Sequence, residues 1–99
     1  MANRAPEKQS RHDQVVKRET RKLERDGWKV KADIPGFDQP TPIGQEGRIP
    51  DIEATKSGRV RLIEVETPES LGRDREQQST FRRSAAQRPN TRFEVVETE

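Results

Sequence analysis

The sequence contains no cysteine and no tyrosine, and it has one tryptophan, three phenylalanines and one histidine among 99 residues. Without cysteine there can be no disulfide framework and no zinc site of the thiolate type, a pattern typical of intracellular proteins. No apolar run approaches the roughly 18 residues that span a membrane, and residues 1–10 lack the apolar segment of a signal peptide. We therefore expect a cytoplasmic protein without membrane contact.

Apolar residues are scarce as well. They make up 26% of the chain against 38% charged residues, so the hydrophobic core must be small. The formal net charge of +2 argues against an extended polyelectrolyte. The length suits one domain, and a homodimer is one way for so thin a core to bury more apolar surface. We expect a flexible tail at residues 1–9 and a single domain over residues 10–99.

Hydrophobic periodicity predicts six regular elements. They are, in order, a helix at residues 10–26, strands at 28–34, 49–55 and 59–66, a helix at 73–88 and a strand at 91–96. The segment 35–47 is rich in proline and glycine and is expected to be a loop, either bordering a substrate groove or serving as a flexible connector.

Helix-end signals set the expected boundaries. Ser10 suits an N-cap, Asp13 stands in the place of a capping-box acid, and Gly27 suits the C-terminal stop of the first helix. For the second helix, Thr67 followed by Pro68 is one expected start, and the region after Gly72 is the other.

Three carboxylates fall in the two central strands. Asp51 lies in the first strand, whereas Glu64 and Glu66 share one face of the second strand and Ile63 and Val65 share the other. Burial of clustered acids costs several kcal/mol each unless a cation or hydrogen-bond donors compensate them. A hard divalent ion such as Mg²⁺ is the usual compensation, and it suits phosphodiester hydrolysis. The alternative is a set of surface acids on an amphipathic hairpin.

Pro50-Asp51 followed by Glu64-Val65-Glu66 resembles the motif of the PD-(D/E)xK nuclease superfamily, which includes restriction enzymes, archaeal Holliday junction resolvases and repair nucleases. The expected element order is similar to that of the superfamily core. The resemblance implies a restriction-endonuclease-like α/β fold of order α-β-β-β-α-β, with a mixed central sheet flanked by helices. It also implies a DNA endonuclease in which Asp51 and Glu64 bind Mg²⁺, or Mn²⁺ as a substitute, with the Val65 carbonyl as a further ligand.

The chain departs from the superfamily at one position, because Glu66 stands where the motif has lysine. Some members work with an acidic residue there, and others carry the lysine elsewhere; the nearby lysines are Lys29, Lys31 and Lys56. In an active enzyme Glu66 would orient or deprotonate the attacking water. The alternatives are a module that keeps the fold without turnover and binds nucleic acid or a partner, and an unrelated domain with exposed acids.

The two helices supply further candidates. His12 and Glu19 lie on the apolar stripe of the first helix, and the superfamily often brings an acidic residue from this helix to its metal. Several nuclease groups place a glutamine of the second helix near the site, which makes Gln77 or Gln78 a candidate. The simpler alternative places all of these side chains at the edge of a stripe or on the surface.

The basic residues indicate how nucleic acid would be bound. Arginine pairs with phosphate bidentately, and a pI near 9.3 permits a polyanionic partner. The candidate contacts are Lys56, Arg82 and Arg83. A domain of this size has little room for base-reading elements, so we expect selectivity for DNA structure rather than for a long sequence.

Overall fold

The computed structural model describes residues 6–44, 46–66 and 75–98, and the side chains of 6–10 and 75–77 are not part of that description. In this part of the chain the elements are α1 (Pro6–Arg25), β1 (Lys29–Ala32), β2 (Ile52–Lys56), β3 (Arg59–Glu66), α3 (Arg75–Gln87) and β4 (Thr91–Glu97). The predicted α/β class and the predicted α-β-β-β-α-β order are therefore confirmed.

The strands form one mixed sheet in the order β1-β2-β3-β4. The first three are antiparallel neighbours, and β4 runs parallel to β3 because α3 carries the chain back between them. Ser57 and Gly58 make the turn of the β2–β3 hairpin, with φ values of 51° and 80°. A two-residue turn with both φ values positive matches the right-handed twist of paired strands. The turn therefore fixes the register of the two strands that carry the carboxylates.

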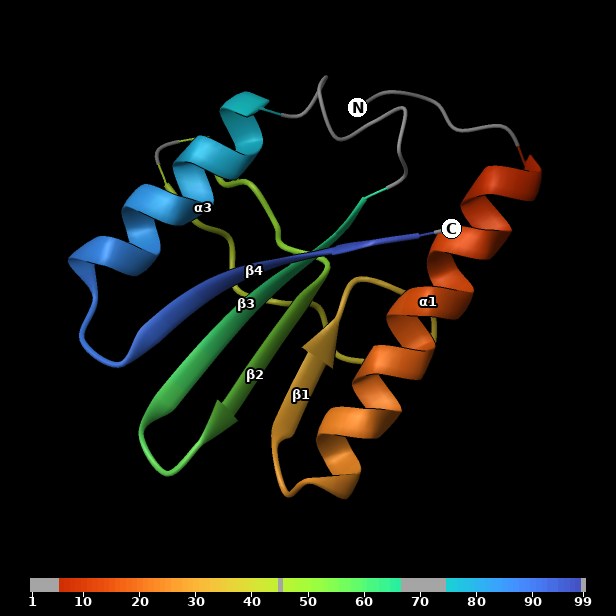
Figure 1. Cartoon of the computed structure of the whole chain (residues 1–99), viewed down its shortest axis with the longest axis horizontal. Coiled ribbons are helices and arrows are strands. Elements are labelled where there is room, and N and C mark those ends of the chain that lie inside the picture. Colours follow the sequence, from red (N-terminus) through yellow and green to blue (C-terminus); the bar gives the residue numbers. More distant parts are fainter. Residues whose placement is uncertain (1–5, 45, 67–74, 99) are drawn as a thin grey trace.

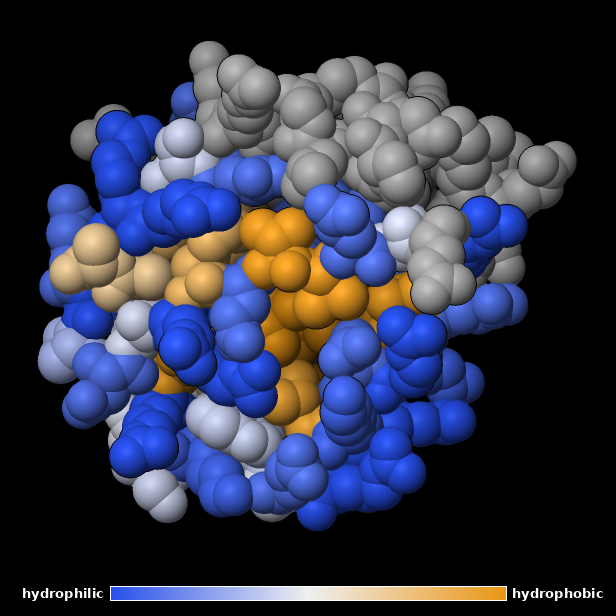
Figure 2. Space-filling model, in the orientation of Figure 1, coloured by the Kyte–Doolittle hydropathy of each residue, from blue (hydrophilic) through white to orange (hydrophobic). Residues whose placement is uncertain are grey.

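Each face of the sheet has its own helix and its own core (Figure 1). Alternation along β3 sends Ile63 and Val65 toward α1 and Leu62 toward α3, as the sequence predicts. The α1-side core consists of Val15, Val16, Leu23, Ala32, Ile34, Ile52, Ala54, Ile63 and Val65. The α3-side core is smaller and consists of Ile43, Leu62 and Phe81, with Val60 and Phe93 packed against it. Figure 2 shows apolar side chains in the middle of one face, surrounded by hydrophilic ones.

The segment between β1 and β2 is a packed layer rather than a flexible connector. Pro40, Ile43 and Pro50 are buried, and Ile43 joins Leu62 and Phe81 in the α3-side core. The backbone amide and hydroxyl of Thr41 both donate to one oxygen of Glu53 at 3.0 Å. This segment therefore shields the α3-side face of the sheet next to Asp51.

The predicted starts of two elements, α1 and β2, were wrong. α1 begins at Pro6, so Ser10 lies inside the helix and is not its N-cap. Proline is well accepted in a first turn, and residues 7–9 are good helix formers, which extends the helix beyond its apolar stripe. β2 begins at Ile52 and not at residue 49, because Pro50 has no N–H for the ladder. The expected starts of the second helix at Thr67, Pro68 and after Gly72 lie outside the described residues.

In the part of the chain that the structure describes, no helix is both long and apolar enough to cross a membrane.

Candidate active site

The antiparallel pairing of β2 with β3 brings Asp51 and Glu64 together. Ile52 is paired with Ile63, so Asp51, one residue earlier, meets Glu64, one residue later. The backbone amide of Asp51 donates to Oε1 of Glu64 at 2.9 Å. Two acids that are 13 residues apart in the sequence therefore share the end of one strand pair.

Two groups hold the carboxylate of Asp51. The Val65 amide donates to its Oδ2 at 2.8 Å, and Nε2 of His12 lies 3.2 Å from the same oxygen. The other ring nitrogen of His12 lies 3.2 Å from Oδ1 of Asp13. A singly protonated imidazole can donate to one of these carboxylates, and a doubly protonated one can donate to both. The ring thus links the first helix to the start of β2.

The acids are removed from water to different degrees. The exposed fraction is 2% for Glu64 and 1% for Glu66, against 15% for the Asp51 side chain. Amide donors and the nearby imidazole offset part of the cost of holding negative charge here. Asp51 directly precedes β2, and Glu64 and Glu66 lie on β3 at the same end of the sheet. The prediction of exposed surface acids is therefore wrong for both glutamates.

The predicted helix contributors divide into two groups. His12 is 3% exposed and lies at the site. Gln78 is half-buried on α3, one turn before Phe81, whose ring packs with Leu62 on the face of β3 that also carries Glu64. Gln77 belongs to α3, but its side chain is outside the described part of the structure. Gln78 therefore lies on the same side of the sheet as Glu64.

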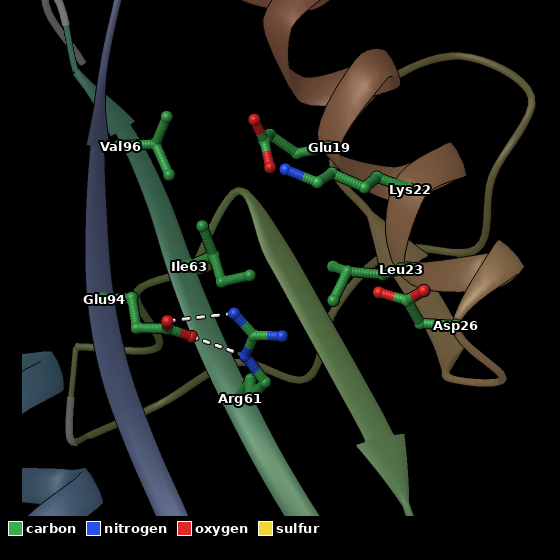
Figure 3. A pocket seen from close by; sticks show the side chains of 8 residues that line it. All are labelled: Glu19, Lys22, Leu23, Asp26, Arg61, Ile63, Glu94 and Val96. Carbon is green, nitrogen blue, oxygen red and sulfur yellow. Dashed lines mark hydrogen bonds and ion pairs between the residues drawn. The ribbon is translucent and has the colours of Figure 1, made fainter.

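Glu19 does not reach the carboxylates of Asp51 and Glu64. It lies two turns, or about 10 Å, further along α1 than His12, and it lines a pocket of about 90 Å³ on the α1 side of the sheet (Figure 3). The other lining residues are Lys22, Leu23, Asp26, Arg61, Ile63, Glu94 and Val96. This pocket is on the opposite face of the sheet from Glu64 and Glu66, so Glu19 is not part of the candidate site.

An ion pair between β3 and β4 forms part of the wall of that pocket. Nε of Arg61 donates to Glu94 at 2.6 Å and its second nitrogen donates to the other carboxylate oxygen at 2.9 Å (Figure 3). The hydrogen bonds to Glu94 raise the pKa of Arg61 above its ordinary value, against the opposing effect of burial. The guanidinium also lies over the Trp28 ring, 5.3 Å from its centroid. These contacts engage Arg61 within the fold, so we assign it a structural role.

The structure separates Lys56 from the carboxylates. Lys56 ends β2, about 16 Å from Asp51 along the strand, and its amine donates to the carbonyl of Asp26 at 2.6 Å. Lys29 and Lys31 are exposed on β1. These positions do not supply the missing motif lysine, because none of the three is held against Asp51 or Glu64. Arg82 and Arg83 are exposed on α3.

The donor chemistry of the site suits a hard divalent ion. Within residues 6–44, 46–66 and 75–98, no three histidine, cysteine, aspartate or glutamate side chains are arranged as a metal-binding cluster. Mg²⁺, however, is commonly held by one or two carboxylates, with water and substrate oxygens completing its shell. Asp51 and Glu64 offer two such carboxylates from adjacent strands.

Sequence reasoning missed two contacts of the site. Asp13 was expected to be a capping acid but lies against His12, and the Val65 amide holds Asp51. Only the position of Asp13 beside the single histidine could have indicated the first contact. Comparisons with family models, with curated proteins and with solved structures find no match to this chain.

Proposed function

We propose that the chain is a metal-dependent nuclease of the PD-(D/E)xK type that hydrolyses DNA phosphodiester bonds and selects DNA by structure. The observation that carries the proposal is the meeting of Asp51 with Glu64, joined by the 2.9 Å hydrogen bond from the Asp51 amide. The α-β-β-β-α-β order supports the proposal, because Asp51 directly precedes the second strand and Glu64 lies on the third, an arrangement similar to that of the superfamily. Glu64 is 2% exposed. Burial of a carboxylate is unfavourable, which supports a functional role for this residue.

Each residue of the site has a distinct role in this proposal. Asp51 and Glu64 would hold a Mg²⁺ ion, with the Val65 carbonyl as a further ligand. When bound, such an ion would polarise the phosphoryl group of the substrate and make a water molecule more acidic. His12 and the Val65 amide keep the Asp51 carboxylate in one orientation. Glu66 is the third acid, which orients the attacking water.

Cleavage of a panel of labelled DNA substrates, including a four-way junction, tests the proposal. We expect the wild-type protein to cut in Mg²⁺ or Mn²⁺ and to lose this activity in Asp51→Asn and in Glu64→Gln, because each change removes a metal-binding charge. Glu53→Gln is the matched control, since Glu53 also lies on β2 but binds Thr41 of the neighbouring segment. Metal-dependent cutting that survives in Asp51→Asn would refute the proposal.

The residue at the motif lysine position favours a second candidate function. Glu66 occupies that position and is 1% exposed. The described lysines on β1 and β2 do not replace the missing amine at the carboxylates. A nuclease-fold module that binds nucleic acid without turnover would explain both facts. Glu66→Lys separates the two candidates: cleavage gained by an otherwise inactive protein supports the module, and cleavage by the wild type excludes it.

A further inference from the structure

The outward side of α1 carries a row of arginines. Arg11, Arg18, Arg21 and Arg25 are separated by seven, three and four residues, a spacing that places them along one side of a helix. All four are exposed. We call these residues the arginine row. At the rise of an α-helix the row is about 21 Å long, and it runs from the level of His12 to the end of α1.

Much of the positive charge in the row is available to a partner. Arg21 and Arg25 form no ion pair with any residue that the structure describes, and Arg18 lies 3.5 Å from Glu19 while its side chain remains 66% exposed. A surface ion pair of this kind contributes little to stability. Lys17 and Lys22 are exposed beside the row. Hydrophilic side chains cover the part of the surface that α1 forms (Figure 2).

Other basic residues are already engaged within the fold. Arg82 lies over the Phe93 ring, 5.3 Å from its centroid, and Nε of Arg83 donates to the Ser79 carbonyl at 3.4 Å. These contacts restrict the guanidinium groups of α3. Arg21 and Arg25 make no such contact with a described residue, so they are better suited to pairing with an external anion.

The position of the row connects it with the candidate active site. Arg11 precedes His12, whose ring lies 3.2 Å from the Asp51 carboxylate. The Arg11 end of the row therefore lies at the level of Asp51, on the side of the sheet that α1 covers. The opposite side of α1 is buried in the core through Val16 and Leu23, so the helix has no free apolar face to insert into a lipid surface.

We infer that the arginine row of α1 binds the phosphate backbone of the DNA substrate, with the Arg11 end of the row nearest to Asp51. This inference rests on the proposed nuclease function and names the surface that carries the substrate. Arginine suits the task because its guanidinium pairs with phosphate oxygens in a planar, bidentate manner. The contacts are to the backbone, so they hold DNA without reading its bases.

Binding of a short fluorescein-labelled DNA duplex, measured by anisotropy in EDTA over a series of salt concentrations, tests the inference. The α1 variant carries Arg18→Gln, Arg21→Gln and Arg25→Gln. The matched control carries Arg82→Gln, Arg83→Gln and Arg88→Gln, which removes the same charge from α3. If the row binds phosphate, the α1 variant lowers the slope of log Kd against log salt by about three and weakens all sequences alike, while the α3 variant changes the slope by less than one.

Equal losses in the two variants, a larger loss in the α3 variant, or no binding by the wild type would each overturn the inference. Cleavage in Mg²⁺ is measured separately for all three proteins, which keeps the two hypotheses apart. Binding through the row without cleavage supports the inference and removes the nuclease. If the wild type cleaves DNA but its binding does not depend on the row, the inference is wrong and the nuclease proposal stands. Thermal unfolding verifies that both variants are folded.

Discussion

His12 is the residue whose placement says most about the site. Its ring is 3% exposed and lies between two carboxylates, with Nε2 toward Asp51 and Nδ1 toward Asp13. The sequence placed His12 on the inward stripe of the helix but could not choose between the site and the stripe edge, because the choice depends on where β2 begins. Asp13 was not identified, since adjacent residues on a helix do not normally face one another.

We expect His12→Gln to retain most of the function of the site and His12→Asn to lose it. The glutamine amide places a donor near the position of Nε2, which meets Asp51, whereas the asparagine amide replaces only the Nδ1 side. Partners that orient metal-binding carboxylates typically contribute 10–100-fold to metal affinity or activity. The Mn²⁺ concentration needed for half-maximal cleavage should therefore rise about tenfold or more in His12→Asn. Equal behaviour of the two variants would show that His12 is only a packing residue.

At the scale of the elements, the hairpin of β2 and β3 is the part that the sequence predicted best. The sequence placed β3 at Arg59–Glu66, as the structure has it, because apolar and charged residues alternate along it except at the adjacent Leu62 and Ile63. The start of β2 was harder to predict from the sequence. Residues 49 and 50 continue the apolar pattern, but Pro50 is buried in a layer that only the folded chain reveals.

The turn of this hairpin is not optimal in sequence. Ser57 has a φ of 51°, a region that asparagine tolerates better than serine. Ser57→Asn should raise the free energy of unfolding by roughly 0.5 kcal/mol, and Gly58→Ala should lower it by about 1 kcal/mol, because alanine is strained at a φ of 80°. Urea denaturation measures both. A stabilised Gly58→Ala protein would contradict the turn geometry.

The Arg61–Glu94 pair joins β3 to β4, and its pH dependence follows from the raised pKa of Arg61. A group whose folded pKa exceeds its unfolded value stabilises the fold fully below the unfolded pKa and loses that effect only as the pH rises through the folded pKa. For Arg61 that window lies above the ordinary pKa of an arginine side chain. The free energy of unfolding of the Arg61→Gln protein should therefore be about 1 kcal/mol lower than that of the wild type. Urea denaturation should show that this difference does not change with pH near neutrality, because Arg61 stays charged there. A stability difference between the two proteins that disappears near neutral pH would contradict the structural role of the Arg61–Glu94 pair.

For the whole molecule, the small hydrophobic core that the composition predicts limits the stability of the fold. Among the described residues, the buried members of the α3-side core are Ile43, Leu62 and Phe81, and Phe81 is the largest. Leu62 and Phe81 lie within the predicted strand at 59–66 and the predicted helix at 73–88, which hydrophobic periodicity revealed. It missed Ile43, because a single apolar residue among prolines and glycines has no period to reveal its burial.

Phe81→Ala should lower the free energy of unfolding by about 3–4 kcal/mol, a large share of the stability of a small domain. Phe81→Leu should cost less, since it retains most of the apolar volume. Urea denaturation in the absence of metal measures both changes. A loss below about 1 kcal/mol in Phe81→Ala would contradict the packing of α3 against the sheet.

Direct titration of the metal-free protein with Mg²⁺ or Mn²⁺ by calorimetry tests the central claim, that Asp51 and Glu64 form one divalent-metal site. We predict one ion per chain for the wild type, affinity weakened at least tenfold in Asp51→Asn and in Glu64→Gln, and little further loss in the double variant, because both acids hold the same ion. A wild type that binds no ion, or a double variant that binds as well as the wild type, would contradict the account.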